Sequence, residues 1–287
     1  MKLHSGLLLF CLSLLPFMES GNSGKSAVPE EINFIQPHLE SLPECAMDNH
    51  SFQAGERAVY TVYYKFGFIW LSAGEVVFTV DERDGKYKFE AKGSTYSTYD
   101  RLFSVRNTYA STVDKKSLMP LEAMRDVKEG SYTKYVELDF DYDARQVIAR
   151  HGKTRNNLQV DHIEMNRCMH DVLSIVYYSR NLDLRGVRKN DVFDFNVCFD
   201  DETYDIGMQY KGREKNKSIR RLGNIDVIEY SPGMIAGNVF NEGDKMTVWV
   251  SDDRNRIPLQ IESPLKVGSV RVVLNEYEGL KYPLAFN

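Results

Sequence analysis

The fold of this chain is constrained most by segments in which apolar and polar residues alternate. Residues 60–64 (YTVYY), 75–81 (EVVFTVD) and 136–141 (VELDFD) place apolar side chains at alternate positions. Successive side chains of a β-strand point to opposite faces, so each segment predicts a strand with one buried face. The second half of the chain shows the same alternation at residues 192–199, 204–210, 224–230, 246–250 and 270–274.

Strands with a single apolar face need a partner surface, and this requirement limits the architecture. Roughly fourteen such segments must either close into a barrel or fold two sheets against each other. We therefore expect a mainly β protein of two related antiparallel curved sheets or half-barrels, over about residues 52–165 and 186–287. The 17 Tyr and 15 Phe residues would fill the core or line a concave face.

Two distant segments repeat the same residues at the same spacing, which favours related halves. The shared pattern is Asp114, Pro120-Leu121, Lys128 and Gly130-Ser131 in the first copy, and Asp252, Pro258-Leu259, Lys266 and Gly268-Ser269 in the second. Pro, Gly and Ser at fixed offsets are typical of turns, so the pattern indicates a repeated structural unit rather than a duplicated catalytic site. We expect each proline to begin a strand and each glycine to lie in the following turn.

One segment departs from the two-residue period. Met169, Val172, Leu173 and Val176 fall at i, i+3, i+4 and i+7, so residues 169–182 predict an amphipathic helix that joins the two halves. We expect Val172, Leu173 and Val176 to be buried against the inner face of the sheets. Asp171 or Arg180 would then enter a partly buried polar network, since a buried charge needs a partner.

The N-terminal residues resemble a targeting segment followed by a tether. Residues 6–18 form an apolar run that is too short to span a bilayer, and small residues follow it. We interpret residues 1–23 as a signal peptide, with the mature chain starting between Gly21 and Ala27, and residues 24–51 as a polar tether or surface strap. The protein is therefore expected to be exported, to the periplasm or cell envelope, without a transmembrane segment after cleavage.

Cysteine content fits an oxidising compartment without fixing a pairing. Signal cleavage would remove Cys11 and leave Cys45, Cys168 and Cys198. Cys168 and Cys198 flank the expected helix and could close a disulfide, but three buried or unpaired thiols fit the sequence equally well. No CxxC motif is present, which gives no support to a redox enzyme or a cysteine-based zinc site.

No motif supplies recognisable catalytic chemistry. The chain has no HExxH, no GxSxG and no nucleotide-binding glycine pattern. His151-Gly152-Lys153-Thr154 lacks the glycine that a phosphate-binding loop needs, because Val147 stands at that position. We expect no catalytic, metal or cofactor-binding residues, and no cofactor.

Three polar residues near the join of the halves remain candidates for a functional or buried polar role. They are His170, Asp171 and Arg180. A metal site at His170-Asp171 would want a second ligand at i+4, where Ser174 stands, and adjacent helical residues do not face one ligand. The helix dipole also favours an Asp in a first turn, which is a structural reason for Asp171.

The charge balance gives no reason to expect nucleic acid or an anionic membrane surface as a partner. The formal net charge is −5 and the pI is about 5.8. An acidic protein is not attracted to polyanions by its net charge.

The assembled motifs resemble the DUF3108 family of uncharacterised exported bacterial proteins. The matching residues are Gly55-Glu56 with Val59-Tyr60, Leu71-Ser72-Ala73-Gly74-Glu75, His170-Asp171-Val172-Leu173-Ser174 with Tyr177-Tyr178-Ser179-Arg180, and Trp249-Val250-Ser251-Asp252 with Ile257-Pro258-Leu259 and Gly268-Ser269. The resemblance covers residues 52–283 and implies a β-rich fold and an envelope location. It implies no reaction. Family members also look distantly similar to curved-sheet carriers of lipoproteins.

Three functions are compatible with these features. We expect first a binding protein that holds an apolar or amphipathic ligand, such as a lipid, lipoprotein or envelope glycan, in a concave β surface. One alternative is an unrecognised hydrolase acting on envelope polysaccharide or lipid, and another is a structural module for protein interaction. An apolar cavity would favour the carrier, whereas convergent carboxylates in a polar cleft would favour the enzyme.

Overall fold

The computed structural model of the chain describes residues 34–35, 45–101, 103–233, 245–265 and 268–286. Within them the protein is mainly β, as the alternating pattern predicts. No helix in this part of the chain has the length and apolarity needed to cross a bilayer. The expected signal peptide lies outside the described residues, as does most of the expected tether.

The described strands form one continuous sheet in place of the two sheets expected from the sequence. Its order is β1-β11-β12-β13-β14-β15-β16-β2-β3-β4-β5-β6-β7-β8-β9, with β10 also paired to β11. The pairs are antiparallel except at β1 and β10, which run parallel to β11. The strands are β1 (Phe34–Ile35), β2 (Arg57–Phe66), β3 (Ile69–Arg83), β4 (Lys86–Thr95), β5 (Val105–Asp114), β6 (Pro120–Glu129), β7 (Tyr132–Asp141), β8 (Gln146–Gly152), β9 (Gln159–Glu164), β10 (Met169–His170), β11 (Val192–Phe199), β12 (Glu202–Ile219), β13 (Gly223–Pro232), β14 (Thr247–Ser251), β15 (Pro258–Pro264) and β16 (Ser269–Glu278).

The ladder between β16 and β2 explains why the two halves share one sheet. These strands pair from Ser269 opposite Lys65 to Glu278 opposite Arg57, with one register shift. Each half therefore satisfies its edge backbone groups with the other half, and neither has to close on itself. The boundary near residues 165–186 separates segments of the chain, but it does not separate two sheets.

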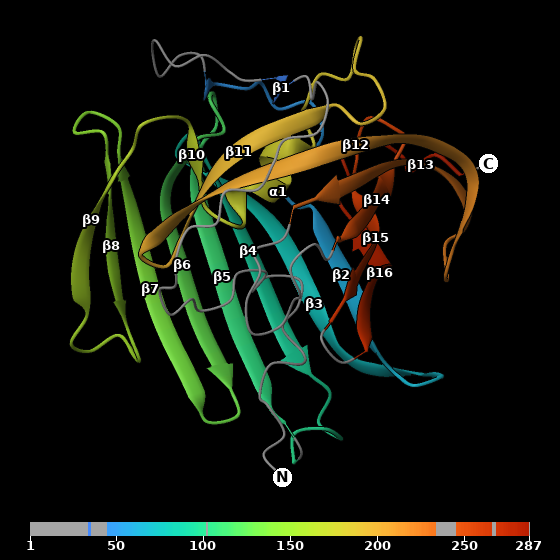
Figure 1. The fold of residues 1–287 in the computed structure, drawn as a ribbon, viewed down its shortest axis with the longest axis horizontal. Coiled ribbons are helices and arrows are strands. Elements are labelled where there is room, and N and C mark those ends of the chain that lie inside the picture. The colour runs from blue at the N-terminus through green and yellow to red at the C-terminus, as the bar shows by residue number, and fades with distance from the viewer. Residues whose placement is uncertain (1–33, 36–44, 102, 234–244, 266–267, 287) are drawn as a thin grey trace, which may run out of the picture.

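The sheet curls so that strands from its two ends face each other (Figure 1). In that view β11 and β12 pass across the face formed by β4–β7, and α1 (Ser174–Ser179) lies close to where they cross it. The largest hydrophobic cluster lies on the enclosed side and draws on β2–β6, α1, β12, β13, β15 and β16. Its most buried members include Phe89, Tyr109, Leu173, Ile225 and Leu259.

The two similar segments adopt the local structure expected of them. Pro120 begins β6 and Pro258 begins β15, where a strand can spare a backbone N–H. Gly130 and Gly268 lie in the turns that follow, with φ of 58° and 81°. At Gly268 a side chain would also collide with the carbonyl oxygen of Lys65, 2.2 Å from the Cβ position. That the segments arose from one repeated unit stays a prediction.

The expected helix over residues 169–182 is much shorter in the structure. Met169 and His170 form β10, paired with β11, and α1 covers only Ser174–Ser179. The turn between them is held by Asp171, whose Oδ1 accepts hydrogen bonds from the backbone N–H groups of Leu173 (2.8 Å) and Ser174 (3.1 Å). Leu173 is fully buried as expected, while Val172 and Val176 are only partly buried. Tertiary hydrogen bonds thus replace the helical bonds that the periodicity predicts.

The cysteine pairing also differs from the one considered for Cys168 and Cys198. Cys168 forms a disulfide with Cys45, and Cys198 is a buried free thiol. The bridge ties the described end of the polar N-terminal segment to the strand before α1. Cys45 is 1% exposed, so this end of the segment is held against the core.

Candidate functional site

A cleft opens between the inner face of β5–β7 and the segments that cross it. Its empty volume is about 310 Å³, including solvent space at its mouth. One wall comes from the three strands, and the other comes from the turn before α1 and from the end of β11 with its turn. The lining residues are Tyr109, Ala110, Ala123, Met124, Arg125, Val136, Leu138, Asp171, Val172, Leu173, Cys198, Phe199 and Asp200. Most of this lining is apolar.

The charged centre of the cleft is Arg125 on β6, which is 8% exposed. Its Nη1 donates to Oδ1 of Asp200 at 2.5 Å, and its Nε donates to the Tyr109 hydroxyl at 3.3 Å. The guanidinium carbon lies 4.5 Å from the ring centre of Phe199. Burial opposes the charged form, but the Tyr109 oxygen and the Asp200 carboxylate outweigh it and raise the pKa of Arg125. The cleft therefore holds a permanent positive charge against aromatic rings.

Strand register places these groups side by side. Tyr109 on β5 is opposite Arg125 on β6, Arg125 is opposite Val136 on β7, and Val136 is opposite His151 on β8. Directly opposite residues of antiparallel strands share a face of the sheet, so this row runs across the inner surface. Asp200 reaches the row from the turn between β11 and β12, far away in the sequence.

A second ionisable group lies on the same strand as Arg125. Glu129 is 8% exposed and its Oε1 accepts a hydrogen bond from the Asn107 side chain at 3.2 Å. Burial raises the pKa of Glu129 to about 7, while the charge of Arg125 and the Asn107 bond act in the opposite direction. Its carboxyl group consequently changes charge near neutral pH.

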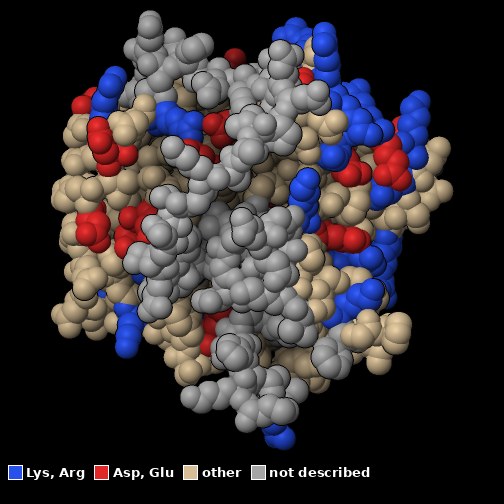
Figure 2. Space-filling view, viewed as in Figure 1, with Lys and Arg blue, Asp and Glu red and all other residues tan. Residues whose placement is uncertain are grey.

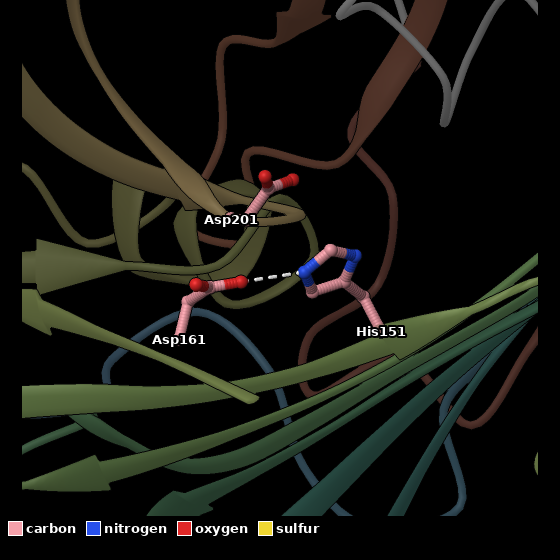
Figure 3. A group of neighbouring side chains, drawn as sticks. All are labelled: His151, Asp161 and Asp201. Atoms are coloured by element: carbon pink, nitrogen blue, oxygen red, sulfur yellow. Dashed lines mark hydrogen bonds and ion pairs between the residues drawn. The ribbon is translucent and has the colours of Figure 1, made fainter. Parts of the chain in front are cut away.

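Beyond Arg125 the charged groups continue as a chain. Lys134 Nζ lies 3.7 Å from Oδ2 of Asp200 and 3.5 Å from Nδ1 of His151. The other ring nitrogen of His151, Nε2, lies 2.6 Å from Oδ2 of Asp161 on β9, as Figure 3 shows. The tip of the β11–β12 hairpin is thus held by cations of the inner sheet face.

His151, Asp161 and Asp201 are close enough to raise the question of a metal site. One ligand atom from each lies within 4.8 Å of the others. Lys134 can only donate a proton, so Nδ1 of His151 accepts and Nε2 carries the hydrogen that it donates to Asp161. That tautomer offers no free lone pair to a cation, and the Lys134 ammonium would repel one. As arranged, these residues fit a hydrogen-bonded chain better than a metal site.

The candidates named from the sequence do not converge on one site. Of the three polar candidates, Asp171 alone lines the cleft, where its Oδ2 accepts a hydrogen bond from Ser111 at 2.6 Å. Burial raises the pKa of Asp171, and its hydrogen bonds oppose this. His170 is buried beside the ring of Tyr178, at 4.3 Å between ring centres, and burial lowers its pKa to about 3. His170 is therefore a neutral core residue.

Arg180 belongs to a separate buried network, in agreement with the expected polar partner. Its guanidinium pairs with both carboxylate oxygens of Glu56, at 2.5 and 2.9 Å. It also donates to the backbone carbonyls of Asn255 (2.9 Å) and Ser51 (3.1 Å). The network joins the N-terminal segment, the end of α1 and the β14–β15 turn, which is a structural role.

Sequence reasoning missed the charged residues in the cleft and beside it. Arg125, Lys134 and His151 lie on separate strands, and the one pattern considered among them, His151-Gly152-Lys153-Thr154, does not match a phosphate-binding loop. Asp200 and Asp201 lie in the turn between β11 and β12, where acidic residues are common for structural reasons. The one available signal was an Arg at a position that the strand alternation assigns to the buried face.

Comparisons with known proteins confirm the resemblance seen in the sequence. The family model described as "Protein of unknown function (DUF3108)" matches residues 59–275. Among solved structures, the fold is similar to the "Crystal Structure of Beta-barrel-like Protein of Domain of Unknown Function DUF1849 from Brucella abortus". The TM-score is 0.55 at 10% identity, over 79% of this chain and 99% of that chain. At this identity the likeness concerns the fold alone. No curated protein matches the chain.

Proposed function

Because the chain belongs to the DUF3108 family, whose description assigns no activity, we propose from its cleft that it binds an amphipathic ligand with an anionic head group. The observation that carries the proposal is Arg125, a buried cation in a mostly apolar cleft. Binding sites for small molecules combine an apolar lining with a few placed polar groups. A guanidinium is suited to carboxylate and phosphate groups because it donates in a planar fork.

The ligand's apolar part would lie along the strand side of the cleft. Ala123, Val136 and Leu138 line that side, and Val172 and Leu173 face them. Because the 310 Å³ includes solvent space at the mouth, the enclosed part of the cleft is far smaller than the roughly 300–1,000 Å³ typical of ligand pockets. A lipid chain, a lipoprotein's acyl group or the lipid part of a glycan would therefore require the cleft to widen.

The pairing of Asp200 with Arg125 provides a way for the cleft to widen. Its carboxylate occupies the position on Arg125 that a ligand head group would take, and it belongs to the turn between β11 and β12. A ligand that replaces this carboxylate would release the hairpin tip from Arg125 and Lys134. The present arrangement is then the closed state, with Asp200 as an internal substitute for the ligand.

An envelope location is part of the same proposal. The expected signal peptide and a disulfide between Cys45 and Cys168 both favour export to an oxidising compartment. Intact mass of the protein recovered from its own host is expected to show a chain starting between Gly21 and Ala27. A chain that keeps Met1 would contradict cleavage.

Binding can be tested with a fatty acid and its neutral analogue. Palmitate should bind the purified protein, Arg125→Met should abolish this binding, and Asp200→Asn should strengthen it. Hexadecanol, which lacks the negative charge, should bind the wild type, Arg125→Met and Asp200→Asn with similar affinity. Arg150→Met is the matched control, because Arg150 pairs with Asp139 on neighbouring strands outside the cleft.

The outcome can be separated from misfolding by circular dichroism and by urea unfolding of each variant. Equal affinity of the wild type, Arg125→Met and Asp200→Asn for palmitate would refute the head-group site. Native mass spectrometry of protein purified from its own host would then identify the class of any ligand it carries.

The hydrolase alternative has less support from the same cleft. Its two carboxylates are Asp171, which accepts hydrogen bonds from the turn before α1, and Asp200, which is paired with Arg125. A general acid and base need carboxyls that are available to a substrate. Both groups are instead engaged in holding the structure together.

A further inference from the structure

Exposed apolar side chains gather at one end of the sheet. In the described residues the exposed large apolar side chains are Phe68, Ile69, Leu71, Tyr132, Val160, Tyr277 and Phe286, and the first five of these lie at the same end. Antiparallel connections place the turns at residues 67–68, 96–104, 130–131 and 153–158 along this end, which we call the turn rim (Figure 1, lower edge).

The most prominent part of the turn rim is the β2–β3 hairpin. Phe68 is 101% exposed and Ile69 is 63% exposed, so the described residues leave both side chains largely uncovered. Trp70 follows, with Lys65 Nζ 5.7 Å from its ring centre and the Arg271 guanidinium 4.4 Å from it. Aromatic and aliphatic side chains at a projecting tip, beside Lys and Arg, suit the boundary between lipid head groups and acyl chains.

Charge on the turn rim differs in sign from the charge of the whole protein. The described turn residues carry three cations, Arg101, Lys153 and Arg155, all exposed. Their single carboxylate, Asp100, is paired with Arg106 at 2.6 Å. The turns at the opposite end carry Asp84, Asp143, Asp252 and Asp253 but also Lys115, Lys116, Arg145, Arg220, Arg221, Arg254 and Arg256, so the turn rim differs from them in its exposed apolar side chains and not in the sign of its charge. In Figure 2 basic and acidic groups are mixed over the visible face, and neither sign is confined to one edge.

From these observations we propose that the turn rim docks on an anionic lipid bilayer surface, with Phe68 and Ile69 entering the head-group layer. The net charge of −5 gives no reason to expect this partner, but the described turns of the rim carry more cations than carboxylates. A second copy of the chain is a poorer occupant, since two basic rims would repel each other. The inference goes beyond ligand binding and adds to it the surface from which an envelope lipid would come.

The strength of docking follows from two contributions. Inserting one Phe side chain should favour the bound state by about tenfold or more in partitioning. Each Lys or Arg near an anionic surface adds roughly fivefold, and this part weakens as salt increases.

Vesicle co-sedimentation tests the proposal. The full chain is mixed with phosphatidylethanolamine vesicles that contain phosphatidylglycerol, and with vesicles that contain none. We expect binding to the first and much weaker binding to the second. Phe68→Ser should reduce binding about tenfold or more, and the double variant Arg101→Gln/Lys153→Gln should weaken its salt dependence. Tyr277→Ser, at the opposite end, is the matched control and should bind as the wild type does.

Three results would overturn the proposal. The wild type could stay in the supernatant with the anionic vesicles, or Tyr277→Ser could lose as much binding as Phe68→Ser. Light scattering could also show a dimer that Phe68→Ser dissociates, without vesicle binding, which would assign the turn rim to a second copy. Arg125→Met separates the two proposals, because it should lose palmitate binding but keep vesicle binding.

Discussion

The buried pair of Arg180 and Glu56 allows a quantitative test of what holds the N-terminal segment, the end of α1 and the β14–β15 turn together. Their side chains are 4% and 2% exposed, and the guanidinium makes two bonds to the carboxylate and two to backbone carbonyls. Arg180→Met keeps much of the volume but leaves the Glu56 carboxylate buried without its cation. Removing one partner of a buried ion pair costs about 3–5 kcal/mol, and we expect a loss of this size in the free energy of unfolding.

A double-mutant cycle separates the pair from the packing around it. Glu56→Gln alone should also destabilise, because Arg180 would be left buried without a counter-charge. The double variant Glu56→Gln/Arg180→Met should lose less than the sum of the single losses, by about 1–3 kcal/mol. The assay is urea unfolding followed by circular dichroism at neutral pH. The exposed pair of Arg185 and Asp183 is the control, and its removal should leave stability unchanged.

Two outcomes would refute this reasoning. Strict additivity in the cycle would show that Arg180 and Glu56 do not act as a pair. A loss below about 1 kcal/mol for Arg180→Met would show that the site takes up water and that the network is not buried in solution.

The remaining predictions concern the core, the ionisable groups and the disulfide. Leu173→Ala should cost about 2–5 kcal/mol in chemical denaturation, and a loss well under 1 kcal/mol would instead mark the segment before α1 as loosely held. The pKa of Glu129 is raised from 4.5 to about 7, so the folded state holds the proton at higher pH than the unfolded state does. The free energy of unfolding should therefore fall between about pH 5 and 7, by roughly 3 kcal/mol at most. Unfolding curves measured across that range should show this fall for the wild type and lack it for Glu129→Gln. The pKa of His170 is lowered from 6.5 to about 3, so stability should be lost as pH falls below 6.5, and a stability profile of His170→Gln should be flatter on the acid side. Cys45→Ser should lower stability by about 2–5 kcal/mol, and a reductant should destabilise the wild type but leave the variant, which has lost the bridge to Cys168, unaffected.

The sequence predicts the local elements well because their causes are local. The strand at residues 136–141 and the hairpins that begin at Pro120 and Pro258 follow from side-chain alternation and from turn residues. The helix over residues 169–182 was overextended for the same reason. Its periodicity was correct for Leu173, but parallel pairing of Met169 and His170 with β11 supplies hydrogen bonds that a period cannot reveal.

The site was harder to anticipate than the fold. Asp171 and Arg180 were expected to be buried and polar, and both are, but they serve separate structural networks. Arg125 carries no motif, and its partner Asp200 comes from a turn on a distant strand. Only the register of β5–β8 and the curl of the sheet bring these groups together, and neither is encoded in a short stretch of residues.

The sequence by itself determined that this protein is mainly β, where most of its strands begin and turn, and to which family it belongs. The β class and the strand positions follow from interactions between residues close in the chain, and the family follows from short motifs, so a local sequence pattern is enough to predict them. The tertiary structure alone decided that β16 pairs with β2 in one sheet, that Cys168 forms its disulfide with Cys45 rather than Cys198, and that the Asp200 carboxylate pairs with Arg125. Each of these depends on the distance between segments after the sheet has curled, and that distance is set by the summed packing of the whole core.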